Sequence, residues 1–373
     1  MDPTTIFCPN LACPARGQIG QGNIRVHSRT AQRWFCLQCR KTFTATKGTA
    51  LYRLRTPADT VTLVLTLLAH GCPLQAIVVA FGFDERTVAA WITRAGRQSR
   101  AVHGHLVEQP QDLGQVQADE IRVKTQGSVV WMALAMMVST RLWLAGAVSA
   151  HRDLPLIRRL IRQVRACALP QGLLFCTDGL CSYVRAIRET FRDAVHTGAG
   201  GRPRLYPWPQ LLIAQVVKRY EQYRVVGIER RIILGTATEV EQVRAASQGE
   251  GVLNTAYIER LNATFRARLA SLTRRGRALA RRLSTLEHGM YLIGTVYNFC
   301  TPHASLCLPG PTARASSRKR TPAMAAGITE HCWTVRELLT FHVPPPRWAP
   351  PKKRGRPSRL LQHLIKRWCG DHG

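Results

Sequence analysis

The chain has 373 residues, in which 53 Lys and Arg stand against 22 Asp and Glu, giving a formal net charge of +31. So large a positive charge predicts a polyanionic partner, and nucleic acid is the first candidate. A membrane surface is the rival polyanion, but the longest apolar run, Val129 to Val138, is far shorter than the ~20 residues that span a bilayer.

The first residues and the cysteine content indicate the compartment. The start, Met-Asp-Pro-Thr-Thr-Ile, lacks the basic and then apolar pattern of a secretory signal. We therefore expect a reducing compartment, the cytoplasm, in which the 12 Cys serve as metal ligands or buried thiols rather than as disulfides.

Two cysteine pairs near the N-terminus have the spacing of a zinc ribbon. Four residues separate Cys8 from Cys13, two separate Cys36 from Cys39, and 22 lie between the pairs. Four thiolates satisfy one tetrahedral Zn²⁺, and about 50 residues cannot otherwise bury enough surface to fold. The sequence thus predicts a structural zinc site in residues 1–50, with two unrelated pairs of buried cysteines as the alternative.

Residues 51–108 show three helical segments. The first begins at Thr56-Pro57 and ends at Gly71, a short second one follows Pro73, and Gly82 precedes a third from about Asp84 to Gln98. This order is typical of a helix-turn-helix DNA-binding domain, with a plain helical linker as the alternative. Val88 and Trp91 would pack inward, and the residues expected to face the major groove are Arg86, Thr87, Thr93, Arg94 and Arg97.

From residue 109 the pattern changes to an α/β order. Three strands are predicted at 115–123, 128–139 and 142–150, followed by a helix at 153–167, a strand at 172–177 and a helix at 183–191. A Gly- and Pro-rich irregular span covers 197–209, and mixed, strand-like sequence follows it. We expect one domain over 109–308.

A helix is predicted from Tyr257 to Arg275 because apolar residues recur there every three or four positions. Beside that stripe, Glu259, Asn262 and Arg266 share one face. A carboxylate, an amide and a guanidinium on one face can serve chemistry. A surface helix with a ladder of Glu and Arg is the alternative.

Beyond Pro309 the sequence is rich in Pro, Ser, Thr and basic residues, which predicts a flexible tail over 309–373 in which only 335–341 is ordered. Within it, the stretch 351–357 resembles an AT-hook, whose Arg354, Gly355 and Arg356 would enter a narrow A·T minor groove. An unspecific basic run is the alternative.

Three carboxylates would meet in the α/β domain. Asp119 lies in the first strand, Asp178 just after the fourth, and Glu259 on the last helix, 59 and then 81 positions apart. Converging carboxylates are suited to Mg²⁺, although Asp also often ends a strand for structural reasons. Glu120 competes with Asp119, and since neighbours on a strand point to opposite faces, we expect only Asp119 to enter the site.

Four motifs together resemble the transposases of the insertion sequence 1 family. They are Gln117-Ala-Asp-Glu120, Thr177-Asp-Gly179 with Tyr183, Glu259-Arg-Leu-Asn262 with Arg266, Leu269 and Thr273-Arg274-Arg275, and Cys36-Leu-Gln-Cys39-Arg-Lys-Thr in the ribbon. The resemblance runs from about Cys8 to His303. Two features depart from the family pattern, a longer span between Asp178 and Glu259 and the AT-hook-like addition.

The resemblance implies an RNase H-like catalytic domain of the Asp-Asp-Glu class. Asp119, Asp178 and Glu259 would hold two Mg²⁺ or Mn²⁺ ions, and Asn262, Arg266, Arg274 and Arg275 would lie near DNA. The implied protein is a prokaryotic, nucleoid-associated transposase, a homodimer or higher oligomer, that acts on the inverted repeats of its own element and on target DNA. Two alternatives stay open, a domesticated DNA-binding protein without activity and an RNase H-like nuclease of repair or resolution.

Overall fold

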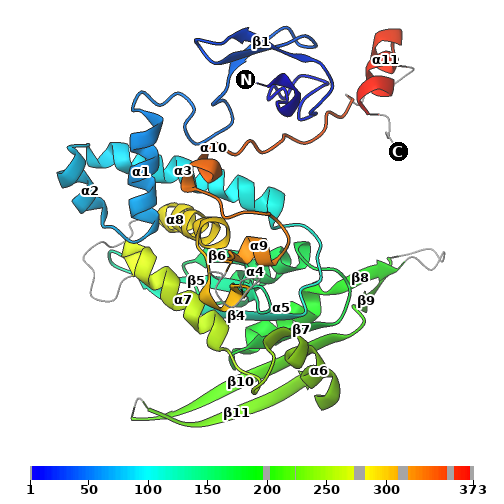
Figure 1. Cartoon of the computed structure of the whole chain (residues 1–373). Helices are drawn as coiled ribbons and strands as arrows, with labels where there is room; N and C mark the ends of the chain where they lie inside the picture. The colour runs from blue at the N-terminus through cyan, green and yellow to red at the C-terminus, as the bar shows by residue number, and fades with distance from the viewer. Residues whose placement is uncertain are drawn as a thin grey trace. The chain divides into compact units, whose positions relative to one another are not determined.

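The computed structural model describes residues 2–195, 202–222, 224–272, 282–309, 318–350 and 357–369 (Figure 1). These residues form two compact units, one from the described parts of 1–58 and 340–373, the other from those of 59–339. The prediction of an α/β protein preceded by a small cysteine-rich module is confirmed.

The first unit is built on a three-stranded antiparallel sheet, β1 (Ile24–Ser28), β2 (Arg33–Cys36) and β3 (Thr42–Thr44), after a short turn, η1 (Pro3–Thr5). So small a sheet has little apolar surface of its own. Trp34 and Phe43 lie buried beside Cys8, Cys13 and Cys36, so the cysteines form part of the core.

The C-terminal residues correct the expectation of a flexible tail. Ser358 caps helix α11 (Arg359–Trp368), because its hydroxyl accepts the Leu361 amide. Trp368 of this helix is only 3% exposed and packs in the core of the four-cysteine module, residues 2–50, called the ribbon below. The Arg16 guanidinium also donates to the carbonyls of Pro346 and Arg347. The ribbon therefore takes part of its core from residues more than 300 positions away in the sequence.

Two further helices lie in the span expected to be a tail. Helix α9 (Pro322–Ala325) is capped by Thr321, and α10 (Val335–Thr340) buries Val335, Leu338 and Leu339. Just before α10, the Trp333 ring lies 4.7 Å from that of Phe299, centroid to centroid. The AT-hook-like residues Arg354, Gly355 and Arg356 lie outside the described residues.

The three predicted N-terminal helices are present as α1 (Ala58–Ala69), α2 (Leu74–Phe81) and α3 (Glu85–Leu106). Gly82 ends α2 with a φ of 68°, and the Asp84 carboxylate caps α3 by accepting the amides of Arg86 and Thr87. Helix α3 is longer than expected because its second half packs against α8 (Leu283–Thr295). A Cβ at Gly96 would lie only 2.5 Å from the His288 carbonyl oxygen, so this close packing requires glycine.

A mixed six-stranded sheet forms the centre of the second unit, in the order β11-β10-β7-β4-β5-β6. Its strands are β4 (Gln115–Lys124), β5 (Val129–Met137), β6 (Trp143–Ser149), β7 (Leu173–Thr177), β10 (Leu211–Glu221) and β11 (Arg224–Leu234). The first three form the predicted antiparallel meander, β7 is parallel to β4 and β10, and β11 is antiparallel to β10. The β10–β11 hairpin projects beyond the sheet (Figure 1). The sequence indicated strand-like residues after 209, but not these two strands or their pairing.

Helices cover both faces of this sheet. Val116 and Ala118 of β4 join the core under α4 (Leu154–Ala166) and α5 (Cys181–Thr190). Ile121 and Val123 of the same strand join the opposite core, under α7 (Ala256–Arg268) and α8. The alternation along β4 thus places a helix-covered core on each side of the strand that carries Asp119.

The remaining elements are short or peripheral. Helix α6 (Ala237–Gln248), with a Thr236–Glu239 capping box, packs on β7 and β10, and β8 (Arg192–Val195) pairs with β9 (Arg204–Pro207). Helix α7 ends at Arg268 instead of continuing to 275, because Leu269 is extended, and η2 (Ala270–Leu272) follows it. After α8 come the π-helical turn η3 (Val296–Cys300) and η4 (Ala304–Leu306). None of the helices in the described ranges is both long and apolar enough to cross a bilayer.

We expect Trp368→Ala to destabilise the first unit by about 3–5 kcal/mol, the usual cost of removing a buried Trp side chain. Leu360→Ala, on the same helix but at a residue 71% exposed, is the matched control and should leave stability nearly unchanged. Limited proteolysis of the zinc-loaded chain, followed by mass analysis of the ribbon fragments, measures the effect. Equal protease resistance of both variants would show that α11 adds no stability to the ribbon.

Candidate functional site

Two acidic residues meet where the pairing of β4 with β7 ends. The last residues paired between these parallel strands are Ala118 and Thr177, so Asp119 and Asp178 follow side by side. Asp119, Glu120 and Asp178 each offer a carboxylate oxygen within 4.8 Å of the others. Residues 59 positions apart in sequence thereby form one acidic cluster.

Hydrogen bonds fix the Asp119 carboxylate on both oxygens. One oxygen accepts the Glu120 amide at 2.8 Å, and the other accepts Nδ2 of Asn262 on α7, also at 2.8 Å. Burial raises the pKa of Asp119, an effect that the amide hydrogen bond opposes and the nearby charges of Asp178 and Glu259 reinforce. The sequence predicted that Asn262 contacts DNA. In the structure its side chain is only 1% exposed and donates to Asp119, which gives it a role in positioning that carboxylate.

A buried glutamine connects β4 to the start of α7. Nε2 of Gln117 donates to the Asn254 carbonyl at 2.6 Å, and its Oε1 accepts the Ile258 amide at 3.0 Å. Gln117 is fully buried, so water does not reach its side-chain amide, and these two hydrogen bonds satisfy both of its polar groups. It holds the first turn of α7, and Glu259 with it, against the strand of Asp119.

The Asp178 loop is fixed from two sides. Oδ1 of Asp178 accepts the Leu180 amide at 3.0 Å, and its backbone carbonyl accepts Nε2 of Gln215 on β10 at 2.9 Å. Behind the loop, Tyr183 is fully buried, and its pKa is raised well above the ordinary value, first by burial and then by the charges of Glu120 and Asp119. The carboxylate of Asp178 therefore has a defined direction toward the cluster.

Glu120 also reaches the cluster, which corrects the expectation that only one of two neighbouring strand residues would enter. The two residues do leave β4 on opposite sides, but β7 ends at Thr177, so no strand separates their side chains beyond that point. The Arg152 guanidinium bridges Glu120 at 3.3 Å and Asp178 at 3.2 Å. Oε1 of Glu120 is buried and has no hydrogen-bond partner among the described residues, and burial raises its pKa to about 7.

Glu259 stands apart from these three carboxylates. It lies in the first turn of α7 with its side chain 43% exposed, and its Oε1 accepts both Nζ of Lys218 at 2.5 Å and Oγ1 of Thr255 at 2.7 Å. The structure thus brings Asp119 and Asp178 together directly, and Glu259 near them but paired with a lysine. Sequence reasoning missed Lys218, Gln215 and Arg152. The first two lie on β10, whose bounds and place in the sheet were not predicted, and Arg152 lies in a turn without a motif.

The carboxylate oxygens of this site suit a hard divalent cation such as Mg²⁺. An orphaned, buried Glu120 oxygen beside Asp119 and Asp178 is an additional acceptor that water beside a bound cation would satisfy.

The other predicted DNA-binding residues differ in their exposure. Arg86, Thr87, Arg94 and Arg97 are exposed on α3, with Thr93 half-buried, while Arg266 is half-buried on α7. Val88 and Trp91 are buried as expected. Arg274 and Arg275 lie outside the described residues.

The four N-terminal cysteines form the second metal-ligand cluster of the described chain. The sulfur of Cys8 lies 3.7 Å from that of Cys39, and the sulfur of Cys13 lies 3.9 Å from that of Cys36. A tetrahedral zinc with 2.3 Å bonds holds its sulfurs about 3.8 Å apart, so the arrangement fits Zn²⁺.

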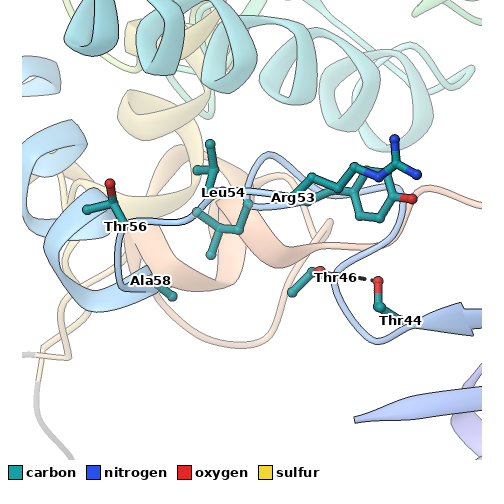
Figure 2. Close-up of a pocket in the computed structure, with 8 residues that line it drawn as sticks. Thr44, Thr46, Arg53, Leu54, Thr56 and Ala58 are labelled. Carbon is teal, nitrogen blue, oxygen red and sulfur yellow. Dashed lines mark hydrogen bonds between the residues drawn. The ribbon is translucent and has the colours of Figure 1, made fainter. Parts of the chain in front are cut away.

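A hollow of about 300 Å³ lies where the chain leaves β3 (Figure 2). Threonines, Leu54 and Arg53 line it, and the hydroxyls of Thr44 and Thr46 are 3.4 Å apart. Its lining residues include no carboxylate, thiol or histidine.

Comparison of the sequence with protein-family models and with curated proteins gives no match.

The full chain should bind one Zn²⁺, and Cys36→Ser should lose it, because three thiolates and a hydroxyl bind zinc less tightly than four thiolates. Cys332→Ser, at an exposed cysteine outside the cluster, is the control. Elemental analysis of the purified proteins measures the content. Full zinc in Cys36→Ser would refute the assignment.

Glu120 should make stability fall with rising pH. Its folded pKa of about 7 exceeds the ordinary value of 4.5, so the folded state holds a proton that the unfolded state has released, and stability declines between these two values. The free energy of unfolding of Glu120→Gln, relative to that of the wild type, should therefore rise by up to roughly 3 kcal/mol across this pH range. Above the range the difference should stay constant.

Urea unfolding at a series of pH values in Mg²⁺-free buffer measures this gain. Glu330→Gln, at an exposed residue, should show no such trend. A difference between Glu120→Gln and the wild type that does not change with pH would mean that Glu120 titrates normally.

Proposed function

We propose that the chain is a DNA transposase of the insertion sequence 1 type, which binds the ends of its element and catalyses Mg²⁺-dependent strand cleavage and strand transfer. The observation that carries this proposal is the convergence of Asp119 and Asp178 at the paired ends of β4 and β7, with Glu259 on α7 nearby. These are the three residues that the family resemblance assigns to catalysis.

The fold supports the same proposal. An antiparallel meander, then two strands parallel to its first strand, with helices on both faces, agrees with an RNase H-like domain. The four-cysteine sheet and the three helices with exposed arginines on α3 supply candidate DNA-binding modules before it. A net charge of +31 favours a nucleic acid substrate.

Each side chain of the carboxylate site has a role in the proposed reaction. Asp119, Asp178 and Glu259 would hold two Mg²⁺ ions, which when bound activate an attacking oxygen and stabilise a leaving one. Asn262 and Gln117 position the carboxylates from β4 and α7. Because Glu120 has a wholly buried side chain and pairs with Arg152, we assign it to orienting Asp178 and not to direct metal binding.

Lys218 gives Glu259 a second state. Its ammonium pairs with Oε1 of Glu259, so it would compete with a metal ion for this carboxylate. On DNA, a strand phosphate is an alternative partner for Lys218, and this exchange would free Glu259.

Changing Asp119, Asp178 or Glu259 to the corresponding amide should reduce cleavage and joining at least roughly a hundredfold while leaving end binding intact, because the charge that holds the metal is lost. Glu120→Gln should be milder, and Glu330→Gln should be unchanged. The assay uses labelled duplexes with the inverted repeats that bracket the gene, and it measures bound, cleaved and joined fractions.

Cleavage by the wild type without divalent metal, or an active Asp178→Asn protein, would contradict the metal mechanism. End binding with no cleavage by the wild type would favour the domesticated DNA-binding protein. Cleavage of any duplex without joining would favour the repair or resolution nuclease.

A further inference from the structure

A basic cavity lies beside α7, and none of the carboxylates described above is among its lining residues. Its volume is about 720 Å³, in the range of small-molecule pockets. Tyr257, Arg260 and Arg268 of α7 line one side, and Arg141 from the β5–β6 turn, Tyr297 and His303 line the rest.

The cations of this cavity have no carboxylate near them among the described residues that line it. Burial lowers the pKa of Arg268 and of Arg141. For Arg141, Tyr257 and Tyr297 oppose this effect and Arg260 adds to it. Burial also lowers the pKa of His303, as do Arg260 and Arg141. A concave site in which cations repel one another favours an anionic ligand.

Aromatic groups give the cavity a flat surface as well. The Arg141 guanidinium lies 3.9 Å from the centre of the Tyr257 ring, and the Tyr297 hydroxyl donates to the Arg141 carbonyl at 3.1 Å. Arg141 lies in the β5–β6 turn with a φ of +61°, a left-handed conformation that is unfavourable for a residue with a side chain.

Helix geometry relates the cavity to the carboxylates. Glu259 and Arg260 are consecutive on α7, so their side chains differ by about 100° around the helix axis and 1.5 Å along it. A strand that passes over the first turns of α7 can therefore reach both faces.

We propose that this cavity binds one unpaired nucleotide of a DNA strand that leads to the carboxylate site, with its phosphate on Arg260 and Arg268 and its base against the Arg141–Tyr257 stack. The inference rests on the proposed function, since it assumes a DNA substrate. Positive charge selects the phosphate, the flat stack selects the base, and the volume admits a nucleotide but not a duplex. The pocket would thus hold a strand that has separated from its complement.

The test compares a blunt duplex with the same duplex carrying a short single-stranded extension, by fluorescence anisotropy in Mg²⁺-free buffer. The wild type should bind the extended duplex more tightly. Arg260→Gln and Tyr257→Leu should each remove about tenfold of affinity for the extension, the scale of one stacking or charge contact. Arg162→Gln, at an exposed arginine of α4, is the charge-matched control and should lower both affinities equally.

A second readout reports on stacking directly. 2-Aminopurine in the extension should be quenched by the wild type and by Arg162→Gln, but not by Tyr257→Leu. Thermal unfolding of each variant shows whether the fold is kept, and Arg260 is exposed, so its substitution does not disturb a core.

Equal losses on blunt and extended duplexes, or an abasic extension that binds as tightly as one with bases, would overturn the nucleotide pocket. Because these binding measurements need no catalysis, they separate the two claims. A chain that cleaves element ends but has no preference for the extension refutes only the pocket. A chain with that preference but no cleavage refutes the transposase activity.

Discussion

The buried side chain of Gln117 joins the strand and the helix on which the carboxylate site depends. Its amide makes hydrogen bonds to Asn254 and Ile258, so the first turn of α7 is tied to β4 two residues before Asp119. An apolar residue at 117 would leave these buried groups unpaired, at a cost of about 1–3 kcal/mol for each. The same contact places Glu259 and Asn262 beside Asp119, and it sets the cavity on the neighbouring face of α7.

Much of the central sheet was predictable because its segments follow simple rules. The strands β4, β5, β6 and β7 are apolar runs bounded by turns, and α4 has a clear apolar stripe opposite its arginines. The β10–β11 hairpin was missed because β11 is mostly exposed on both faces, which removes the periodicity that reveals a strand. The C-terminal residues were predicted to be flexible, but Trp368 packs in the ribbon core more than 300 positions away in the sequence. A local sequence pattern does not reveal so distant a contact.

The candidate site was predictable in part. Asp119 and Asp178 follow a strand pairing that the α/β order implies, so their meeting could be expected from the sequence. The entry of Glu120 depends on β7 ending one residue before Asp178, a detail of strand length, and the pairing of Glu259 with Lys218 depends on the unpredicted strand β10. Asn262 was expected to contact DNA because polar residues on one helix face look alike in sequence, whereas its burial shows a positioning role.

In the proposed mechanism, the carboxylates of β4, the β7–α5 loop and α7 hold a pair of divalent cations. Electron paramagnetic resonance of bound Mn²⁺ tests it most directly, because two Mn²⁺ ions held roughly 3.5–4 Å apart give an exchange-coupled spectrum. Two coupled Mn²⁺ per chain should appear on element-end DNA, and Asp178→Asn should lose the coupled signal. Uncoupled or absent Mn²⁺ in the wild type, or the same coupled signal in Asp178→Asn, would contradict it.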